Sequence, residues 1–472
     1  MRAHPAGPRH GDVLTPGGAP QRPGSAEDLH RIDPRIWPAG ADRDPDGVLR
    51  IAGADVRDLA GQFQTPLFVM DEADFRARAR GYHGAYDDGD TPADVYYAGK
   101  AFLATTVARW IMDEGLNLDV CSGGELAVAL RAGVPGERIL FHGNNKSVPE
   151  LARALDAGVG RFVVDSYLEI ARLAALAEER GTVAPVLVRV TVGVEAHTHE
   201  FIATAHEDQK FGLSLAGGEA EEAVRRIAKL PSLRLVGLHS HIGSQIFDPA
   251  GFEVAAARLA SLAARLRDEQ GIEVGELNLG GGMGIAYVDA DDPLDVAEMA
   301  AQLREIVSKA CADAGIPVPR LAVEPGRAVV GPSGVTLYEV GTVKPVDLGH
   351  GVVRTYVSVD GGMSDNIRTA LYDADYTVTL ASRTSDAEPM LTRIVGKHCE
   401  SGDVVVRDAW LPADLAPGDL LAVAATGAYC RAMASSYNYL PRPAVVSVRD
   451  GATAVVLRRE TEDDLLSLDP GA

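Results

Sequence analysis

The sequence has few cysteines, and none of them falls in a disulfide or metal-binding pattern. Cys121, Cys311, Cys399 and Cys430 are scattered over 472 residues, and no C-x-x-C pair occurs. This spacing argues against a disulfide framework and against a zinc cluster. We therefore expect a reducing, cytoplasmic location and no bound metal.

Long apolar runs and basic clusters are also missing. No segment approaches the roughly 18 apolar residues that a membrane helix needs. The formal net charge is −22, with 45 basic against 67 acidic residues, and no basic block stands out. The sequence thus predicts neither membrane insertion nor nucleic-acid binding. Residues 1–47 are rich in proline, glycine and charge and lack the apolar centre of a signal peptide, so we expect a disordered extension there.

Eight short apolar runs, most of them followed by a helical pattern, fill the middle of the chain. They are Val95–Ala98, Leu116–Val120, Ile139–Phe141, Phe162–Val164, Val186–Val190, Leu233–Leu238, Glu276–Leu279 and Leu321–Val323. Eight alternations of strand and helix are typical of a closed (β/α)8 barrel, which we expect over residues 73–330. An open doubly wound sheet has the same local alternation and stays an alternative.

The sequence changes character after Val323. Short β-branched runs separated by turn residues follow without helical crossovers, which predicts a mainly antiparallel β domain over residues 331–472. The predicted strands are Val335–Val343, Val352–Val359, Tyr376–Leu380, Val404–Val406, Leu420–Ala424, Ala444–Val448 and Thr453–Leu457. The early run Pro66–Val69 precedes the barrel and is expected to join this domain, together with the rest of segment 48–72. The barrel would then be an insertion within the β domain.

Lys100 follows the first of the eight runs and opens a helical pattern. A parallel barrel carries its chemistry at the carboxyl ends of its strands, so a lysine at this position is predicted to lie at the site. Taken alone, a lysine is more often a solvated surface charge.

Three glycines, Gly280, Gly281 and Gly282, follow the seventh run. Glycine lets backbone N–H groups approach an anion closely, and barrels commonly bind phosphate in the loops after strands seven and eight. The spacing is neither G-x-G-x-x-G nor G-x-x-x-x-G-K-[ST], which does not favour a nucleotide. A plain tight turn is the alternative.

Glu324 and Arg327 follow the eighth run and could simply pair with each other. A buried carboxylate would alternatively keep a pyridine nitrogen protonated and strengthen its pull on electrons.

His239, His241 and Ser244 follow the sixth run. Two histidines at i and i+2 could chelate a metal only if both pointed the same way, and no third ligand is evident nearby. One histidine could instead lie flat on an aromatic cofactor while Ser244 donates to a phosphate. Either histidine could also be structural. Together with Lys100, these residues suggest pyridoxal 5'-phosphate held as a Schiff base on the lysine.

Eight separated motifs, spread from about Val48 to near the C-terminus, point to one family. They are Tyr97–Lys100, Asp119–Glu125, His142–Lys146, His239–Gln245, Gly280–Gly282, Glu324–Arg327, His398–Asp403 and Gly427–Tyr429. With them the chain resembles the pyridoxal-phosphate-dependent decarboxylases that have an alanine-racemase-like barrel. Within that family it is most similar to members acting on meso-2,6-diaminopimelate.

The resemblance implies decarboxylation of meso-2,6-diaminopimelate to L-lysine and CO2, the last step of lysine biosynthesis. It also implies a homodimer with shared active sites. An ornithine- or arginine-type basic amino-acid decarboxylase is the main alternative, although the Cys399-Glu400-Ser401 sequence differs from that subgroup. Alanine racemase is disfavoured by Glu324, since its relatives place an arginine near the ring nitrogen. A homologue that has lost the cofactor is disfavoured by the presence of Lys100.

The family's roles can be carried to matching positions. Catalytic roles are implied for Lys100 and Cys399, with Cys399 near the proton delivered to Cα. Cofactor contacts are implied for Lys100, His241, Ser244, Gly280, Gly281, Gly282, Glu324, Gly326 and Tyr429. Substrate contacts are implied for Arg327, Arg368, Tyr372, Glu400 and Tyr429. In the family, the residues matching Cys399 and Glu400 come from the partner subunit.

Overall fold

The computed structural model describes residues 21–87, 93–193, 210–347 and 353–471. Contacts divide the chain into two compact units. One, here called the barrel unit, comprises residues 76–284 and 292–329. The other, the β unit, comprises residues 1–75, 285–291 and 330–472.

The barrel unit has eight parallel strands in a closed ring. In ring order they are β5 (Ala93–Ala98), β6 (Asn117–Val120), β7 (Ile139–Phe141), β8 (Arg161–Val164), β9 (Ala184–Thr191), β11 (Leu233–His239), β12 (Glu276–Asn278) and β13 (Arg320–Val323). The pairings β8–β9 and β13–β5 close the ring, and β10 (Leu213–Ser214) pairs only with β9. The predicted closed barrel is confirmed, and the open sheet is excluded.

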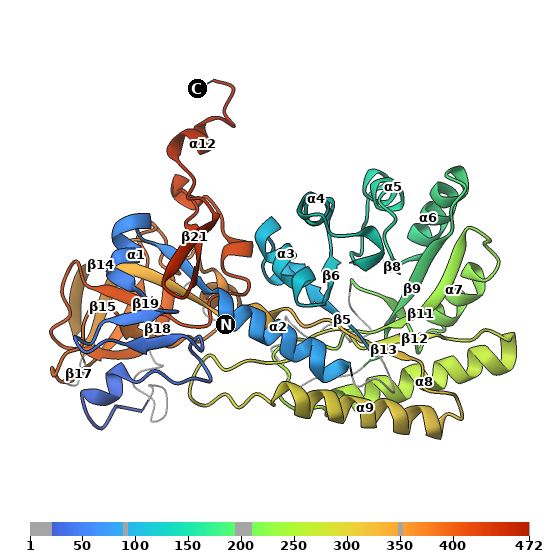
Figure 1. Cartoon of the computed structure of the whole chain (residues 1–472), viewed down its shortest axis with the longest axis horizontal. Coiled ribbons are helices and arrows are strands. Elements are labelled where there is room, and N and C mark those ends of the chain that lie inside the picture. Colours follow the sequence, from blue (N-terminus) through green and yellow to red (C-terminus); the bar gives the residue numbers. More distant parts are fainter. Residues whose placement is uncertain (1–20, 88–92, 194–209, 348–352, 472) are drawn as a thin grey trace. The chain divides into compact units, whose positions relative to one another are not determined.

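Helices follow the strands and lie outside them (Figure 1). They are α3 (Thr105–Asp113), α4 (Gly123–Ala132), α5 (Val148–Asp156), α6 (Tyr167–Glu179), α7 (Glu219–Ile227), α8 (Ala250–Gln270) and α9 (Val296–Asp313), preceded by α2 (Glu72–Tyr86). Serine caps begin several of them: the Ser122 and Ser147 hydroxyls each accept a backbone N–H of the first turn. Such caps fix where each helix starts after its strand.

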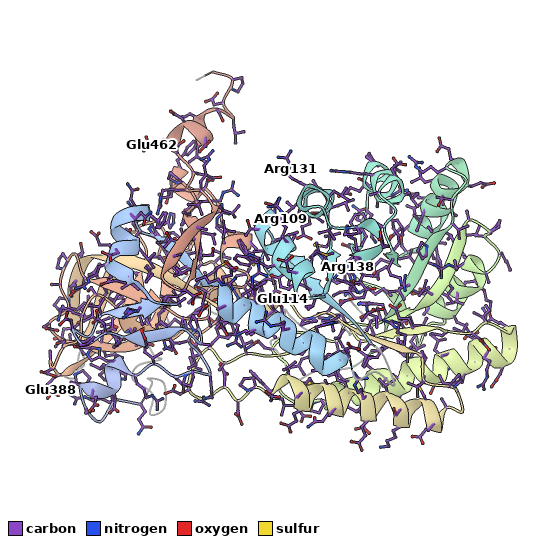
Figure 2. All side chains as sticks on the ribbon, in the orientation of Figure 1. Arg109, Glu114, Arg131, Arg138, Glu388 and Glu462 are labelled. Atoms are coloured by element: carbon purple, nitrogen blue, oxygen red, sulfur yellow. The ribbon has the colours of Figure 1, made fainter. Side chains whose placement is uncertain are left out.

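Apolar residues from different strands fill the barrel interior. One cluster consists of Tyr96, Leu140, Val163, Leu187 and Ala322, which come from five of the eight strands. Because this plug is packed, chemistry is confined to the strand ends. Outside the strands, the buried Glu114 accepts hydrogen bonds from Arg76 at 2.8 Å and from Arg80 at 2.6 Å (Figure 2).

The β unit is built on a nine-stranded mixed sheet. Its strands run in the order β18 (Val404–Pro412), β17 (Pro389–Val395), β15 (Val353–Val359), β14 (Gly334–Asp347), β4 (Leu67–Asp71), β20 (Ala444–Arg449) and β21 (Ala452–Leu457). Strand β19 (Leu420–Val423) pairs with β14 and with β16 (Val378–Leu380). Most pairs are antiparallel, as predicted, whereas β4–β20 and β15–β17 are parallel.

The first strand of this sheet behaves as the sequence predicted. Strand β4 precedes the barrel and pairs with β14, which follows it, through Met70 opposite Gly334. The strand pattern had not included β17. The chain thus enters the barrel unit after β4 and returns to the β unit at β14, the strand that pairs with β4.

Residues 21–47 are described as part of the β unit, whereas the sequence predicted a disordered extension over 1–47. Ile36 and Trp37 are fully buried in its core, beside Leu49 and Val69. The remainder of the predicted extension, residues 1–20, lies outside the described residues. A short sheet of β1 (Ala41–Arg43), β2 (Leu49–Ile51) and β3 (Ala54–Asp55) leads into α1 (Val56–Phe63).

No helix among the described residues is both long enough and apolar enough to span a membrane.

Candidate active site

The predicted cofactor residues of the barrel unit lie just beyond the carboxyl ends of four strands. Lys100 follows β5, His241 and Ser244 follow β11, the Gly280–Gly282 run follows β12, and Glu324 follows β13. The strands are parallel, so these ends share one rim of the barrel. Segments far apart in the sequence are thereby brought to one site.

Lys100 lies in a 3-10 turn, Gly99–Ala101, and its side chain is exposed. Its positive charge acts on Asp119, His142 and His241, which are on neighbouring strand ends. Burial, together with the charge of Glu324, raises the pKa of Asp119 well above its usual range, and Lys100 opposes that shift. The lysine charge is therefore close enough to influence a buried acid and two imidazoles at other strand ends.

Glu324 is a buried carboxylate between two histidines. Its Oε1 lies 2.9 Å from His142 Nε2, and its Oε2 lies 3.4 Å from His239 Nε2. Arg327 donates to the Ser244 hydroxyl at 3.0 Å. The sequence had left open a simple pairing of Glu324 with Arg327, and the structure shows these other partners for the two side chains.

His241 and the glycine run are packed against each other. The backbone N–H of Gly281 donates to His241 Nδ1 at 3.3 Å, which leaves the ring proton on Nε2. Burial holds the pKa of His241 well below its usual range, and Lys100 adds to the shift. The imidazole is therefore neutral and suited to lying against an aromatic ring.

Only glycine fits two positions of the run. Gly280 and Gly282 have φ values of +70° and +111°. A Cβ on Gly280 would lie 2.8 Å from the Ser240 carbonyl oxygen, and a Cβ on Gly282 would lie 2.4 Å from that of Gly243. The glycines thus form a close-packed turn at the end of β12, where backbone approaches backbone with no side chain between, as in loops that bind phosphate.

Gly326 lies close to the end of β5. A Cβ there would come within 2.9 Å of the Ala98 side chain and 3.0 Å of its carbonyl oxygen. The turn after Glu324 can therefore pack against the strand that leads to Lys100.

Arg368 is the central charge of the predicted substrate residues in the β unit. It begins α11 (Arg368–Tyr372), is 6% exposed, and donates from Nη1 to the Tyr376 hydroxyl at 2.5 Å. Its guanidinium carbon lies 4.8 Å from the ring centroid of Tyr287. Among the described residues no carboxylate pairs with Arg368. A buried cation in phenolic surroundings is suited to binding an anion from outside the chain.

The loop that carries Cys399 and Glu400 is held from several sides. Asn438 Oδ1 accepts from the Cys399 backbone N–H at 3.3 Å and lies 3.1 Å from His398 Nδ1. Asp403 accepts from the His398 backbone N–H at 2.8 Å. Cys399 is exposed and Glu400 is half-buried, so a fixed loop presents a thiol and a carboxylate side by side.

Tyr372 and Tyr429, the remaining predicted residues, are half-buried in the β unit. Tyr429 has φ +62°, a left-handed conformation that a bulky residue adopts at a cost of roughly 1–3 kcal/mol. Strain of this kind concentrates at functional sites.

Sequence reasoning missed four neighbours of the predicted residues: His142, Asp119, Tyr287 and Tyr376. His142 and Asp119 lie at strand ends within two of the family motifs, and that position could have marked them as site residues. Nothing in the local sequence marked Tyr287 or Tyr376 as partners of Arg368.

Comparison with known proteins identifies the family. Residues 72–331 match the pyridoxal binding domain of the pyridoxal-dependent decarboxylases. Diaminopimelate decarboxylase of Mycobacterium leprae is 59% identical over 99% of this chain and all of its own length. The chain belongs to the diaminopimelate decarboxylase family. The Mycobacterium tuberculosis H37Rv relative is 60% identical over 94% of this chain and 99% of its own length.

Solved structures of the family share this fold. Diaminopimelate decarboxylase from M. jannaschii, in complex with L-lysine, superposes with a TM-score of 0.85 at 31% identity, covering 92% of this chain and 98% of its own.

The barrel rim fits the pyridoxal phosphate that the family uses. Its residues include a glycine turn of the kind that approaches phosphates, a neutral imidazole suited to the ring face, and a buried carboxylate suited to the ring nitrogen. The Lys100 amine is exposed for covalent attachment. The chain is thus a pyridoxal-phosphate-dependent carboxy-lyase.

Proposed function

We propose that the chain removes CO2 from meso-2,6-diaminopimelate and yields L-lysine, the last step of lysine biosynthesis. One observation carries the choice of substrate: the buried Arg368 guanidinium has no carboxylate partner among the described residues. Diaminopimelate has a second carboxylate that can fill this role, whereas ornithine and arginine do not. The names of the relatives support the same substrate.

The predicted cofactor residues bind and orient the cofactor in this proposal. Lys100 attaches it through Nζ, Glu324 holds the proton on its ring nitrogen, and His241 lies on its ring. Ser244, Gly280–Gly282, Gly326 and Tyr429 contact its phosphate side. Bound pyridoxal phosphate supplies an electron sink for the pair left when the carboxylate departs. An anionic Glu324 deepens that sink because it stabilises the protonated ring.

The substrate's distal end is bound by charge. Arg327, Arg368 and Tyr372 bind the distal carboxylate, and Glu400 takes the distal ammonium, with Tyr429 beside it. A guanidinium binds a carboxylate through paired hydrogen bonds. A substrate without the distal carboxylate would leave the buried guanidinium charge unpaired and would bind less well. Cys399, whose thiol is exposed, lies near the proton that is delivered to Cα.

We further propose a cytoplasmic homodimer in which Cys399 and Glu400 complete the partner's site. A fixed loop that presents a thiol and a carboxylate to the surface supports this arrangement. The four cysteines are free, which fits a reducing compartment. Mixing subunits that lack Lys100 with subunits that lack Glu400 tests it. Partial recovery of activity supports shared sites, and no recovery in mixed dimers contradicts them.

The substrate is tested by measuring CO2 release and lysine formation from meso-diaminopimelate against ornithine, arginine and D-alanine. We expect kcat/KM to be highest for diaminopimelate. Faster turnover of ornithine would favour the basic amino-acid decarboxylases instead. An Arg368→Lys variant tests whether Arg368 causes this preference. It should lower kcat/KM for diaminopimelate more than kcat/KM for ornithine.

A further inference from the structure

Three strand ends of the barrel unit bring Glu324, His142 and His239 together in a buried cluster. His142 follows β7, His239 ends β11, and Glu324 follows β13. Both histidines approach the carboxylate with Nε2, at 2.9 Å for His142 and at 3.2 and 3.4 Å from the two oxygens for His239. The side chains of all three are less than a tenth exposed.

Burial sets the protonation of the two rings. It lowers the pKa of His142 and lowers that of His239 to about 4, although the charge of Glu324 opposes both shifts. Lys100 and Arg189 add positive charge that disfavours a charged His142. At neutral pH each imidazole is therefore neutral and has one N–H to donate.

That N–H belongs on Nε2 in both rings, because an ionised carboxylate only accepts hydrogen bonds. Among the described residues His239 Nδ1 has no hydrogen-bond partner, which suits a nitrogen without a proton better than a buried donor. Burial disfavours the charged form of Glu324, and the hydrogen bonds from the two Nε2–H donors oppose that effect and lower the pKa of Glu324.

The ring of His142 is fixed in place from two directions. It meets His239 edge-on, with centroids 4.8 Å apart and planes at 67°. The loop that bears it is anchored by Lys146, whose Nζ donates to the carbonyl oxygens of Gly143 and Val163 at 2.7 Å and to Glu169 at 2.6 Å. The His142–Lys146 motif therefore contains both the histidine that contacts Glu324 and the lysine that anchors its loop.

We propose that His142 and His239 are positioning residues that keep Glu324 a carboxylate and aim it at the ring nitrogen of the cofactor. This inference rests on the cofactor role of Glu324 in the proposed function. Two neutral donors stabilise the anion without cancelling its charge, so the negative charge stays available to a protonated ring. A charged histidine would instead neutralise Glu324.

A metal ion is the competing occupant of this cluster. The three ligand atoms lie within 4.8 Å of one another. A metal would need the Nε2 lone pairs to be free, however, whereas His142 Nε2 is at hydrogen-bonding distance from Glu324 Oε1. Direct hydrogen bonds account for the observed geometry.

The first test uses the unaltered apoprotein labelled with ¹⁵N-histidine. We expect NMR to show His142 and His239 as neutral Nε2–H tautomers from about pH 6 to 8. Single His→Gln variants assign the two signals. An imidazolium at pH 7 in either ring, or an Nδ1–H tautomer, would overturn the proposal. So would tight binding of Zn²⁺ by the apoprotein with displacement of these ring protons.

The second test removes the donors. His142→Phe and His239→Phe should each weaken binding of pyridoxal phosphate to the apoprotein by roughly tenfold, because a hydrogen bond to a charged group is lost. Each should also produce an infrared band of a protonated carboxyl that disappears when Glu324→Gln is added. His142→Gln, which retains an N–H donor, should recover part of the affinity. Exposed His83 provides the control, His83→Phe, which should change neither readout.

Unchanged affinity together with no carboxyl band in correctly folded variants would overturn the proposal. If the Phe variants do not fold, the NMR experiment on the unaltered protein decides alone. None of these readouts involves turnover, so failure to decarboxylate diaminopimelate would count against the proposed function and leave this result standing.

Discussion

Arg368 Nη1 lies 2.5 Å from the hydroxyl oxygen of Tyr376, deep in the β unit. The Tyr376 ring meets Tyr287 edge-on, at 83° and with centroids 5.2 Å apart, and both rings lie beside the guanidinium. The Tyr376 hydroxyl oxygen is also 3.6 Å from Cys430 Sγ. The cation is thus oriented by neutral groups, which leaves its charge for a ligand.

Removing that hydroxyl should affect substrate binding more than catalysis. Tyr376→Phe keeps the ring but frees the guanidinium to reorient, so we expect KM for meso-diaminopimelate to rise roughly tenfold with kcat changed little. Steady-state kinetics measure both. Tyr356→Phe, on β15 of the same unit, is the matched control. A fall in kcat without a change in KM would show that Tyr376 does not act through substrate binding.

Loss of the Lys100 amine should prevent covalent attachment of the cofactor. In Lys100→Ala we expect no turnover and no cofactor fixed by borohydride reduction, detected by mass spectrometry of the intact chain. Lys397→Ala, an exposed lysine of the β unit, should leave attachment intact. Reducible attachment in the Lys100 variant would refute the assignment.

Lys146 and Glu169 form a buried ion pair, with side chains 1% and 5% exposed. Lys146→Met leaves the carboxylate buried without its partner, and we expect the free energy of unfolding to fall by about 3–5 kcal/mol. The double variant Lys146→Met/Glu169→Leu removes both charges and should regain most of the loss. Urea unfolding followed by circular dichroism measures each value, and equal losses in the two variants would argue against a coupled pair.

Asp365 should make the β unit less stable as pH rises. Burial raises the pKa of Asp365 to about 7, although its hydrogen bond with Tyr338 opposes the shift. Because the folded-state pKa exceeds the unfolded value near 3.8, the folded state binds the extra proton between these two values. The protonated Asp365 contributes fully to the free energy of unfolding below about pH 4. This contribution, roughly 4 kcal/mol, is lost as the pH rises through 7.

Asp365→Asn isolates this effect, because an amide can accept from the Gly362 N–H and donate to Tyr338 without titrating. The stability difference between the variant and the parent should grow in the variant's favour from pH 4 to pH 7. Urea unfolding at several pH values measures it, and a difference independent of pH would contradict the raised pKa.

The repeated pattern of the barrel was readable from the sequence, but several pairings were not. All eight barrel runs became strands, since each apolar run is followed by its own helix and several of these helices have a capped start. Strand β17 went unrecognised, and its parallel partner β15 precedes it by a connection that no local signal specifies. The burial of Trp37 likewise depends on a core supplied largely by strands late in the sequence.

The site residues likewise divide into those marked by local sequence and those that depend on contacts between distant segments. Strand-end position pointed to Lys100 and Glu324 because parallel strands put their ends on one rim. The contact between His142 and Glu324 joins residues 182 positions apart and depends on ring orientation, which no spacing in the sequence specifies.

Strand β4 is made early, yet its two sheet neighbours, β14 and β20, emerge only after the whole barrel has been synthesised. Until then, the apolar cluster that includes Trp37 and Val69 lacks the residues that the later strands contribute to it. Loop-closure entropy and slow non-local pairing make such a segment aggregation-prone on the ribosome. Chaperone dependence during synthesis would follow from this interleaved chain path.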